Sequence, residues 1–285
     1  MSSTLTANPS YAARPLKVVE PTRGWAALNL TDIWNYRDLL ASLATRDVKL
    51  RYRQTALGVA WVLLQPLLAA GAFTFVFGVI AKMPSGGKPY LLITYAGLLG
   101  WNLFNGIVSR SSGCLLINSQ LVSKVYFPRM VLPLSTVASV FLDFVVAAAL
   151  LVLLMLYYHV RPGMGLVVMP ACILSMVMLA LGIGTYAAAL SVTYRDVQYV
   201  LPYVTQILMY ASPVGYLPEK VPQRFAFAYH LNPITPLIEA FRWSALGTNE
   251  MHWRFFTYSV VVSLLLFFLG LVAFRRMERR FADVI

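Results

Sequence analysis

Long apolar segments recur along the chain and predict a membrane protein built from helices. A helix needs about 20 mostly apolar residues to cross a bilayer. Six segments meet or approach this length, namely Leu57–Ile80, Tyr90–Ser109, Val131–Tyr158, Gly165–Val192, Val200–Tyr216 and Phe256–Phe274. The third and fourth are long and the fifth is short, so we expect tilt or a broken helix in these three. The predicted fold class is therefore all-α, a membrane protein with six transmembrane helices over residues 57–274.

A different pattern precedes the first span. Between residues 31 and 56, Ile33, Tyr36, Leu40 and Leu43 recur at helical spacing, and most charged residues lie elsewhere around the helix. This pattern is typical of an amphipathic helix that lies on the cytoplasmic membrane surface. The alternative is a solvated helix that packs on a soluble partner. Residues 1–30 are polar and predict a cytoplasmic N-terminal tail.

A short polar helix is predicted between the second and third spans, over residues 118–126. Asn118 is a suitable N-cap. Phe127-Pro128 would end the helix, because the residue before a proline avoids the helical conformation.

Residues 217–253 are too apolar for an ordinary loop and too broken to span. Thr235-Pro236 is a helix start and Gly247 is a natural stop. The helix between them would be about 16 Å long, half a bilayer, which suggests re-entrant gate helices within residues 218–247. Such backbone is stable at membrane depth only when protein or a water-filled cavity surrounds it.

Composition supports the membrane assignment and explains the charge. Hydrophobic residues make up 59% of the chain and charged residues 12%, whereas about 25% is usual in soluble domains. The net charge of +12 would suit nucleic acid, but most Lys and Arg residues lie beside apolar segments, where lipid headgroups are the expected anionic partner. The distribution of Lys and Arg favours both termini in the cytoplasm, with residues 275–285 as a C-terminal tail. We expect no nucleic-acid partner.

The sequence lacks the motifs of the enzyme classes we considered. No metal-ligand, nucleophile or paired-carboxylate motif occurs, and Ser85–Tyr90 (SGGKPY) has proline where a P-loop needs Ser or Thr. Cys114 and Cys172 match no metal or redox spacing and are read as packing residues. We therefore expect a transport protein with no catalytic residue, cofactor or metal of its own.

Few ionisable residues fall within the apolar segments. Asp143 is the one such residue in the six predicted spans. It could line a polar passage or be a buried acid paired with a neighbouring helix, and the sequence leaves both open. Glu239 and Arg242, in the predicted re-entrant segment, are spaced i,i+3 and can pair.

Aromatic and amide side chains are frequent in the spans. Rings can stack on the C–H faces of sugars and amides can bond to sugar hydroxyls, so these residues together could line a path for a glycan. Packing, or a place in an interfacial aromatic belt, is the alternative for each of them. The candidate path residues are Trp61, Gln65, Tyr95, Trp101, Asn102, Phe104, Asn105, Tyr203 and Tyr210.

Three stretches resemble one known family. RDVKLRYRQTALGVAWVLLQPLL (Arg46–Leu68) resembles the opening signature of ABC-2 type polysaccharide exporter permeases, which include O-antigen, capsule and teichoic-acid export subunits. VYFPRMVLPLS (Val125–Ser135) is similar to the family's entry into the third helix, and NPITPLIEAFRWSALG (Asn232–Gly247) to its extracellular re-entrant segment. The three occur in the family's order within a chain of the expected six-helix topology, so the resemblance extends over essentially everything after residue 30.

The resemblance implies a type V ABC exporter fold and a half-transporter. Two copies of the chain would pair, and two copies of a separate ABC ATPase subunit, which binds Mg-ATP, would bind underneath. The amphipathic segment would be the interface helix and residues 118–126 the coupling helix. By this resemblance the ATPase coupling residues are Asn118, Gln120, Lys124, Tyr126, Tyr194, Arg195 and Asp196, and the gate residues are Asn232, Pro233, Glu239 and Arg242.

The implied function is export of a lipid-linked polysaccharide, with O-antigen favoured, across the bacterial cytoplasmic (inner) membrane. Capsule polysaccharide, teichoic acid, or a small lipid or drug are alternative cargoes. A membrane-embedded glycosyltransferase or acyltransferase is the alternative from another class, and the missing acidic and histidine motifs count against it.

Basic residues stand directly before the first span. Lys49, Arg51 and Arg53 would lie in the headgroup layer, where each gains about 1 kcal/mol from anionic lipid. A lipid-linked glycan would present its phosphates there, although simple membrane anchoring is the alternative. Pro66 lacks a backbone donor and Gln65 adds an amide beside it, which suits a helix that faces a water-filled path.

Overall fold

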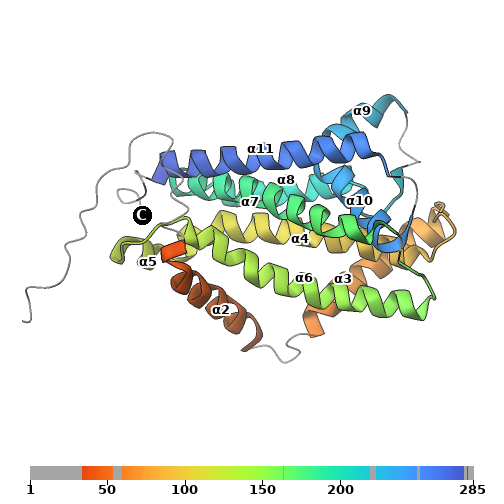
Figure 1. The fold of residues 1–285 in the computed structure, drawn as a ribbon, viewed down its shortest axis with the longest axis horizontal. Helices are drawn as coiled ribbons and strands as arrows, with labels where there is room; N and C mark the ends of the chain where they lie inside the picture. Colours follow the sequence, from red (N-terminus) through yellow and green to blue (C-terminus); the bar gives the residue numbers. More distant parts are fainter. Residues whose placement is uncertain are drawn as a thin grey trace, which may run out of the picture.

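The computed structural model describes residues 34–53, 60–162, 164–218, 223–248, 251–278 and 281, and within these ranges the chain is helical without a strand. Most of the long helices run side by side in one bundle (Figure 1). The elements are α2 (Arg37–Arg53), α3 (Ala60–Phe73) with a π-helical continuation η3 (Thr74–Ile80), α4 (Tyr90–Ile117), α5 (Ser119–Lys124), α6 (Val131–Tyr157), a 3₁₀ turn η4 (Met164–Val168), α7 (Met169–Thr193), α8 (Val197–Ala211), α9 (Gln223–Leu231), α10 (Ile234–Leu246) and α11 (Trp253–Glu278). The predicted N-terminal tail lies outside the described residues.

Five helices in the described residues are long and apolar enough to cross a membrane, so the chain is a multi-pass membrane protein. They cover Ala60–Ile80, Tyr90–Ile117, Val131–Tyr157, Gly165–Thr193 and Trp253–Glu278, and each overlaps a predicted span. The last continues four residues into the predicted C-terminal tail. The prediction of six spans is therefore not confirmed.

The missing span is the fifth, Val200–Tyr216. In its place α8 has 15 residues, about 22 Å, whereas the hydrocarbon layer is about 30 Å thick. The helix ends because Pro213 follows Ser212, whose backbone is extended at φ −108° and ψ 154°. A residue before proline avoids the helical region, so the apolar residues beyond it do not lengthen the helix.

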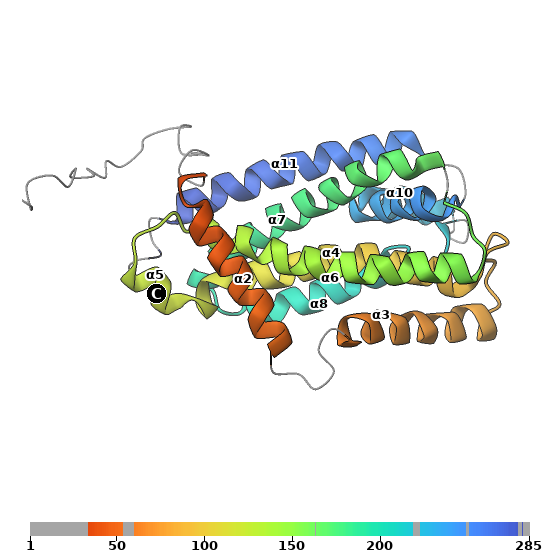
Figure 2. The ribbon, with the colours of Figure 1, turned by 60° about the horizontal axis from the view of Figure 1, so that its bottom comes forward.

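The short helices lie at opposite ends of the bundle. The α5 end also holds the last turn of α11, and the α10 end also holds α9 (Figure 1). Figure 2 shows α2 crossing the bundle obliquely near the α5 end, with α3 along the edge. We use these two names for the ends below, since their assignment to cytoplasm and exterior stays a prediction.

The bundle is built around α4. In the most apolar 18-residue stretch of its span, 78% of the residues are buried, whereas the corresponding share is 11% in the span that contains α3. Tyr95 and Phe104, predicted to line the path, lie in this core instead. The Tyr95 hydroxyl donates to the Ala147 carbonyl at 3.0 Å. The prediction is corrected for both residues, because their helix face points into the bundle.

Glycines let the helices around α7 approach closely. A Cβ on Gly270 of α11 would overlap the carbonyl oxygen of Gly182 of α7, and a Cβ on Gly184 would lie 2.8 Å from Cβ of Ser111 on α4. Small residues of this kind permit tight helix packing within membranes. Gly184 therefore packs against α4 within the chain.

The apolar stripe of α2 packs on the chain itself. Leu43 is buried, and Tyr36 and Leu40 pack against the cluster that contains Phe127 and Met130, from the segment that joins α5 to α6. Trp34 and Leu50 are exposed. The helix lies within the predicted range 31–56, and its position on a membrane surface stays a prediction.

Both cysteines of the chain are free thiols and both are buried. Cys114 lies near the end of α4 and Cys172 near the start of α7.

Candidate substrate cavities and coupling surface

A cavity of about 420 Å³ lies between α2, α3, α4 and α6. We call it the charged cavity, because it holds two arginines and an aspartate. Its lining residues are Arg51, Val62, Gln65, Pro66, Ala69, Leu98, Leu99, Asn102, Leu103, Gly106, Arg110, Val140, Asp143, Phe144 and Ala147. The polar and charged members lie among apolar side chains from four helices.

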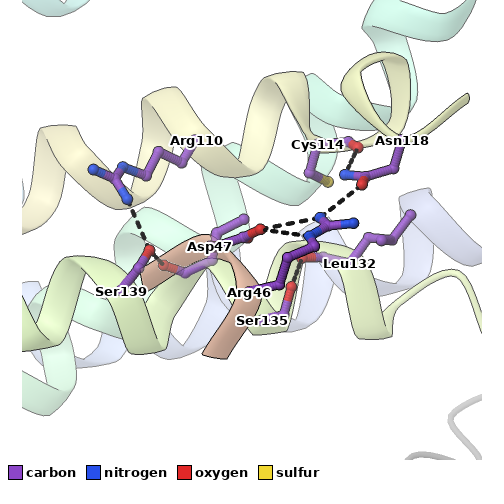
Figure 3. Close-up of polar contacts among 9 residues, drawn as sticks. Arg46, Asp47, Arg110, Cys114, Asn118, Leu132, Ser135 and Ser139 are labelled. Carbon is purple, nitrogen blue, oxygen red and sulfur yellow. Dashed lines mark hydrogen bonds and ion pairs between the residues drawn. The ribbon is translucent and has the colours of Figure 1, made fainter. Parts of the chain in front are cut away.

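Asp143 of α6 joins these helices. Its carboxylate forms an ion pair with Arg51 at the end of α2, and Arg110 Nη2 of α4 lies 3.6 Å from the same oxygen, Oδ2. Arg110 also donates through Nη1 to Ser139 Oγ at 2.8 Å, as Figure 3 shows. The sequence left open whether Asp143 lines a polar passage or pairs with a neighbouring helix. In the structure it pairs with arginines of α2 and α4, and these three side chains also line the cavity.

The predicted phosphate residues separate in the structure. Arg51 faces Asp143, whereas Lys49 is exposed on α2 and does not line the charged cavity. The side chain of Arg53 lies outside the described part of the chain. Arg110 was missed, because in the sequence it is one more basic residue at the end of a span.

A second cavity, also about 420 Å³, lies between α4 and α8. We call it the amide cavity, after Asn105, Gln198 and Gln206. The Asn105 Oδ1 atom is buried and has no hydrogen-bond partner within the described residues, so this acceptor could bond to a ligand hydroxyl or to water. The remaining lining residues are Trp101, Ser109, Ser112, Leu201, Pro202, Thr205 and Met209.

The outer face of α8 carries a stripe of polar aromatic residues. Tyr199, Tyr203, Gln206 and Tyr210 are all exposed, and at about 100° per residue they fall within about 60° of one another. We call these four residues the α8 stripe. Tyr199 and Gln206 were not predicted, although their spacing from Tyr203 by four and three residues is a signal that the sequence contains.

The predicted path residues therefore divide among separate surfaces. Gln65 and Asn102 line the charged cavity, and Trp101 and Asn105 line the amide cavity. Trp61 is exposed on α3. Pro66 is buried within α3 and lines the charged cavity beside Gln65, as expected for a helix that faces a polar space rather than lipid.

Six of the seven predicted coupling residues are exposed at the α5 end, and Asn118 is half-buried. Gln120, Lys124 and Tyr126 extend from α5 and the segment after it. Tyr194, Arg195 and Asp196, also exposed, form the turn between α7 and α8. Such surfaces could contact a soluble subunit.

Asn118 does not cap α5 as predicted. Its side chain makes no cap bond. Instead Nδ2 donates to the Cys114 carbonyl at 2.8 Å, and Oδ1 accepts from Arg46 Nη2 of α2, also at 2.8 Å. Arg46 is held in turn by Asp47 Oδ1 (Figure 3). These hydrogen bonds connect α2 directly to the residue before α5.

The predicted gate residues build a polar cluster at the α10 end. Arg242 is buried and donates through Nη1 to the Tyr216 carbonyl at 3.1 Å, while Tyr229 donates to Glu239 Oε1 at 3.0 Å. Glu239 and Arg242 thus bond to other groups rather than to each other, which corrects the predicted pair. Their charges still interact, since Arg242 acts to lower the pKa of Glu239.

The start and end of α10 differ in how well they were predicted. The helix begins at Ile234 with Pro233 in the N-cap position, two residues before the predicted cap at Thr235. Asn232 takes the capping role, since its Oδ1 accepts from the Ile234 amide at 3.3 Å. The end at Gly247 is confirmed, with φ 62°, a left-handed conformation that glycine adopts readily.

Burial changes the acidity of Glu239. Desolvation raises the pKa of its carboxyl from an ordinary 4.5 to about 7, although Arg242 and the Tyr229 hydroxyl act in the opposite direction. Between these values the folded protein holds a proton that the unfolded chain has released. The stabilisation from this proton is complete below about pH 4.5 and is lost as the pH rises through about 7.

Replacing Glu239 by Gln should remove this pH dependence. We expect the difference in unfolding free energy between the Gln variant and the wild type to grow, in favour of the variant, by up to about 3 kcal/mol from pH 4.5 to 8. Thermal unfolding of both proteins across this range would measure it. Parallel curves for the two proteins would show that Glu239 is not the titrating group.

Comparisons with known proteins agree on one family. The family described as ABC-2 type transporter matches residues 38–246. The chain is 26% identical over 250 residues to the O-antigen export system permease protein RfbA of Klebsiella pneumoniae, covering 87% of this chain and 95% of that protein. It is 29% identical over 213 residues to the protein of the same name from Myxococcus xanthus, covering 74% and 81%. It is also 25% identical over 247 residues to the polysialic acid transport protein KpsM of Escherichia coli, covering 83% and 92%.

Proposed function

Because this chain belongs to the ABC-2 type transporter family, we propose that it is the membrane subunit that exports a lipid-linked polysaccharide, with O-antigen as the favoured polymer. Relatives named for O-antigen export align over most of its length, as does one named for polysialic acid transport. A capsule polysaccharide is therefore the second candidate. In this proposal two copies pair in the inner membrane with both termini in the cytoplasm.

The observation that carries the proposal is the α8 stripe beside the amide cavity. Tyrosines of an interfacial belt gather at the headgroup level. The α8 stripe instead extends over eleven residue steps from Tyr199 to Tyr210, about 16 Å along the helix. Its hydroxyls are poorly suited to lipid and well suited to a sugar chain, and the side chains of the amide cavity are neutral donors and acceptors. We propose that this surface faces a path between two copies of the chain.

Energy would come from a separate ATPase that binds Mg-ATP. Its proposed contacts are the exposed residues of α5 and the turn at Tyr194-Arg195-Asp196. Since Arg46 of α2 binds Asn118 beside α5, a push on α5 would also move α2, which carries Arg51 of the charged cavity.

The first test is ATP hydrolysis by the permease purified with its ATPase, with and without purified lipid-linked glycan. We expect the glycan to stimulate hydrolysis. Replacing Tyr203 and Tyr210 together by Leu should lower the stimulation about thirtyfold, since aromatic contacts contribute roughly 1 kcal/mol each, and should leave basal hydrolysis unchanged.

Tyr186 supplies the matched control. It is an exposed tyrosine on α7, away from the α8 stripe, so Tyr186→Leu should keep full stimulation. Equal losses in the two variants would argue against a path along α8. Failure of any ATPase to form a complex with the permease would contradict the transport proposal itself.

A further inference from the structure

The charged cavity has an anion-binding end and an apolar end. Along α4, Arg110 lies toward the α5 end, and Leu98 lies about 18 Å farther toward the α10 end. Ala69 of α3 and Ala147 of α6 also lie on the apolar side, while Asn102 lies between. A ligand with a charged head and a long apolar tail matches this order, and the volume is within the range of ligand pockets.

The charged end holds more positive than negative charge. The guanidinium groups of Arg51 and Arg110 both approach one oxygen, Asp143 Oδ2. Among the described residues, one carboxylate lies between two guanidiniums, which leaves one positive charge in excess. The side chains are about one-third exposed for each arginine and 15% exposed for the aspartate, so water and salt screen this charge less than on an open surface. The site therefore favours a further anion.

We propose that Asp143 occupies the position of a phosphate group, and that the phosphate of a lipid-linked substrate displaces it from between Arg51 and Arg110. The planar guanidinium binds phosphate through paired hydrogen bonds. A terminal phosphate or a pyrophosphate has more negative charge than a carboxylate and can compete with it for the two arginines. The phosphodiester of a phospholipid has only one negative charge. The lipid chain lies against the apolar end, along α3 at the edge of the bundle (Figure 2). This inference rests on the proposed function for the identity of the substrate.

The proposal is tested on the purified permease alone, in detergent, with undecaprenyl phosphate as the probe and native mass spectrometry as the readout. Asp143→Asn should bind this lipid about tenfold more tightly, because the competing carboxylate is gone. Arg110→Gln should bind it about tenfold more weakly, the effect of one lost charge-assisted hydrogen bond. Asp143→Glu keeps the carboxylate and should bind as the wild type does.

Lys49→Gln is the matched control. Lys49 lies two residues before Arg51 on α2 but does not line the cavity, so its loss should leave binding unchanged. Melting temperatures establish that each variant is folded. The proposal is overturned if Asp143→Asn binds no more tightly than the wild type, or if Lys49→Gln weakens binding as much as Arg110→Gln.

Two competitors identify the source of the phosphate. Phosphatidylglycerol should compete weakly, and equal competition would make the cavity a general phospholipid site and overturn the assignment. Inorganic phosphate should also compete weakly, and competition as strong as that of the lipid would contradict a role for the apolar end. The assay needs neither ATPase nor transport. If the binding pattern holds and glycan does not stimulate hydrolysis, the exporter proposal fails and the phosphate-lipid site stands.

Discussion

Arg242→Ala is expected to destabilise the protein by about 3–5 kcal/mol, the cost of removing one partner from a buried charged cluster. Arg242 is among the largest fully buried side chains. Its loss would remove the donor to the Tyr216 carbonyl and leave Glu239 buried without the nearby positive charge. Thermal unfolding of the purified protein above pH 7, where Glu239 is ionised, would measure the effect.

Two variants separate charge from packing. Arg161 is exposed in the segment between α6 and α7, so Arg161→Ala should change stability by less than about 0.5 kcal/mol. The double variant Glu239→Gln, Arg242→Met removes both charges and keeps most of the volume, and should be more stable than Arg242→Ala. A double variant as unstable as the single one would show that Arg242 stabilises the protein through its own hydrogen bond to the Tyr216 carbonyl, and neither through its volume nor by neutralising Glu239.

Gly270→Ala is expected to destabilise the protein by about 1–3 kcal/mol, although alanine is the better helix former. The added Cβ would overlap the backbone carbonyl of Gly182. A backbone atom cannot rotate away as a side chain can, so α7 and α11 would have to separate along their contact. A lower melting temperature and weaker hydrogen-exchange protection in both helices should result.

Gly71 provides the control for this substitution. It lies within α3, and an added Cβ there would meet, among the described residues, no atom within 4 Å outside the neighbouring turns of its own helix. Gly71→Ala should therefore raise helix stability by up to about 1 kcal/mol. If both glycine variants change stability in the same direction, the close contact between α7 and α11 is not what Gly270 preserves.

Local signals in the sequence were sufficient to predict the position of most helices. Apolar length located five spans, and Gly247 ended α10 where a left-handed residue is needed. The fifth predicted span is not confirmed, because hydropathy alone counted Ser212–Tyr216 as membrane helix, whereas the helix ends before Pro213. Backbone conformation, which depends on one residue and its neighbour, outweighed the summed hydrophobicity of the segment.

The charged cavity could not be predicted in the same way. Arg51, Arg110 and Asp143 come from three separate helices. In the sequence each has an ordinary explanation: Arg51 as a membrane anchor, Arg110 as a basic residue on the cytoplasmic side of a span, and Asp143 as a buried acid. Tyr95 and Phe104 show the converse, since aromatic character did not reveal which face of α4 points into the bundle. Contacts between distant segments decide these cases, and one sequence contains little information about them.

The burial of both native thiols has a practical consequence for spectroscopy. Cys114 and Cys172 are buried in the helix bundle, so labels that modify exposed thiols should not react with them. A single cysteine introduced at Tyr126, Trp61 or Tyr203, all exposed, would then be the reactive group. Two such cysteines in one chain would carry spin or fluorophore pairs that report distances between the α5 end, α3 and α8 during turnover, in a protein that keeps its native cysteines.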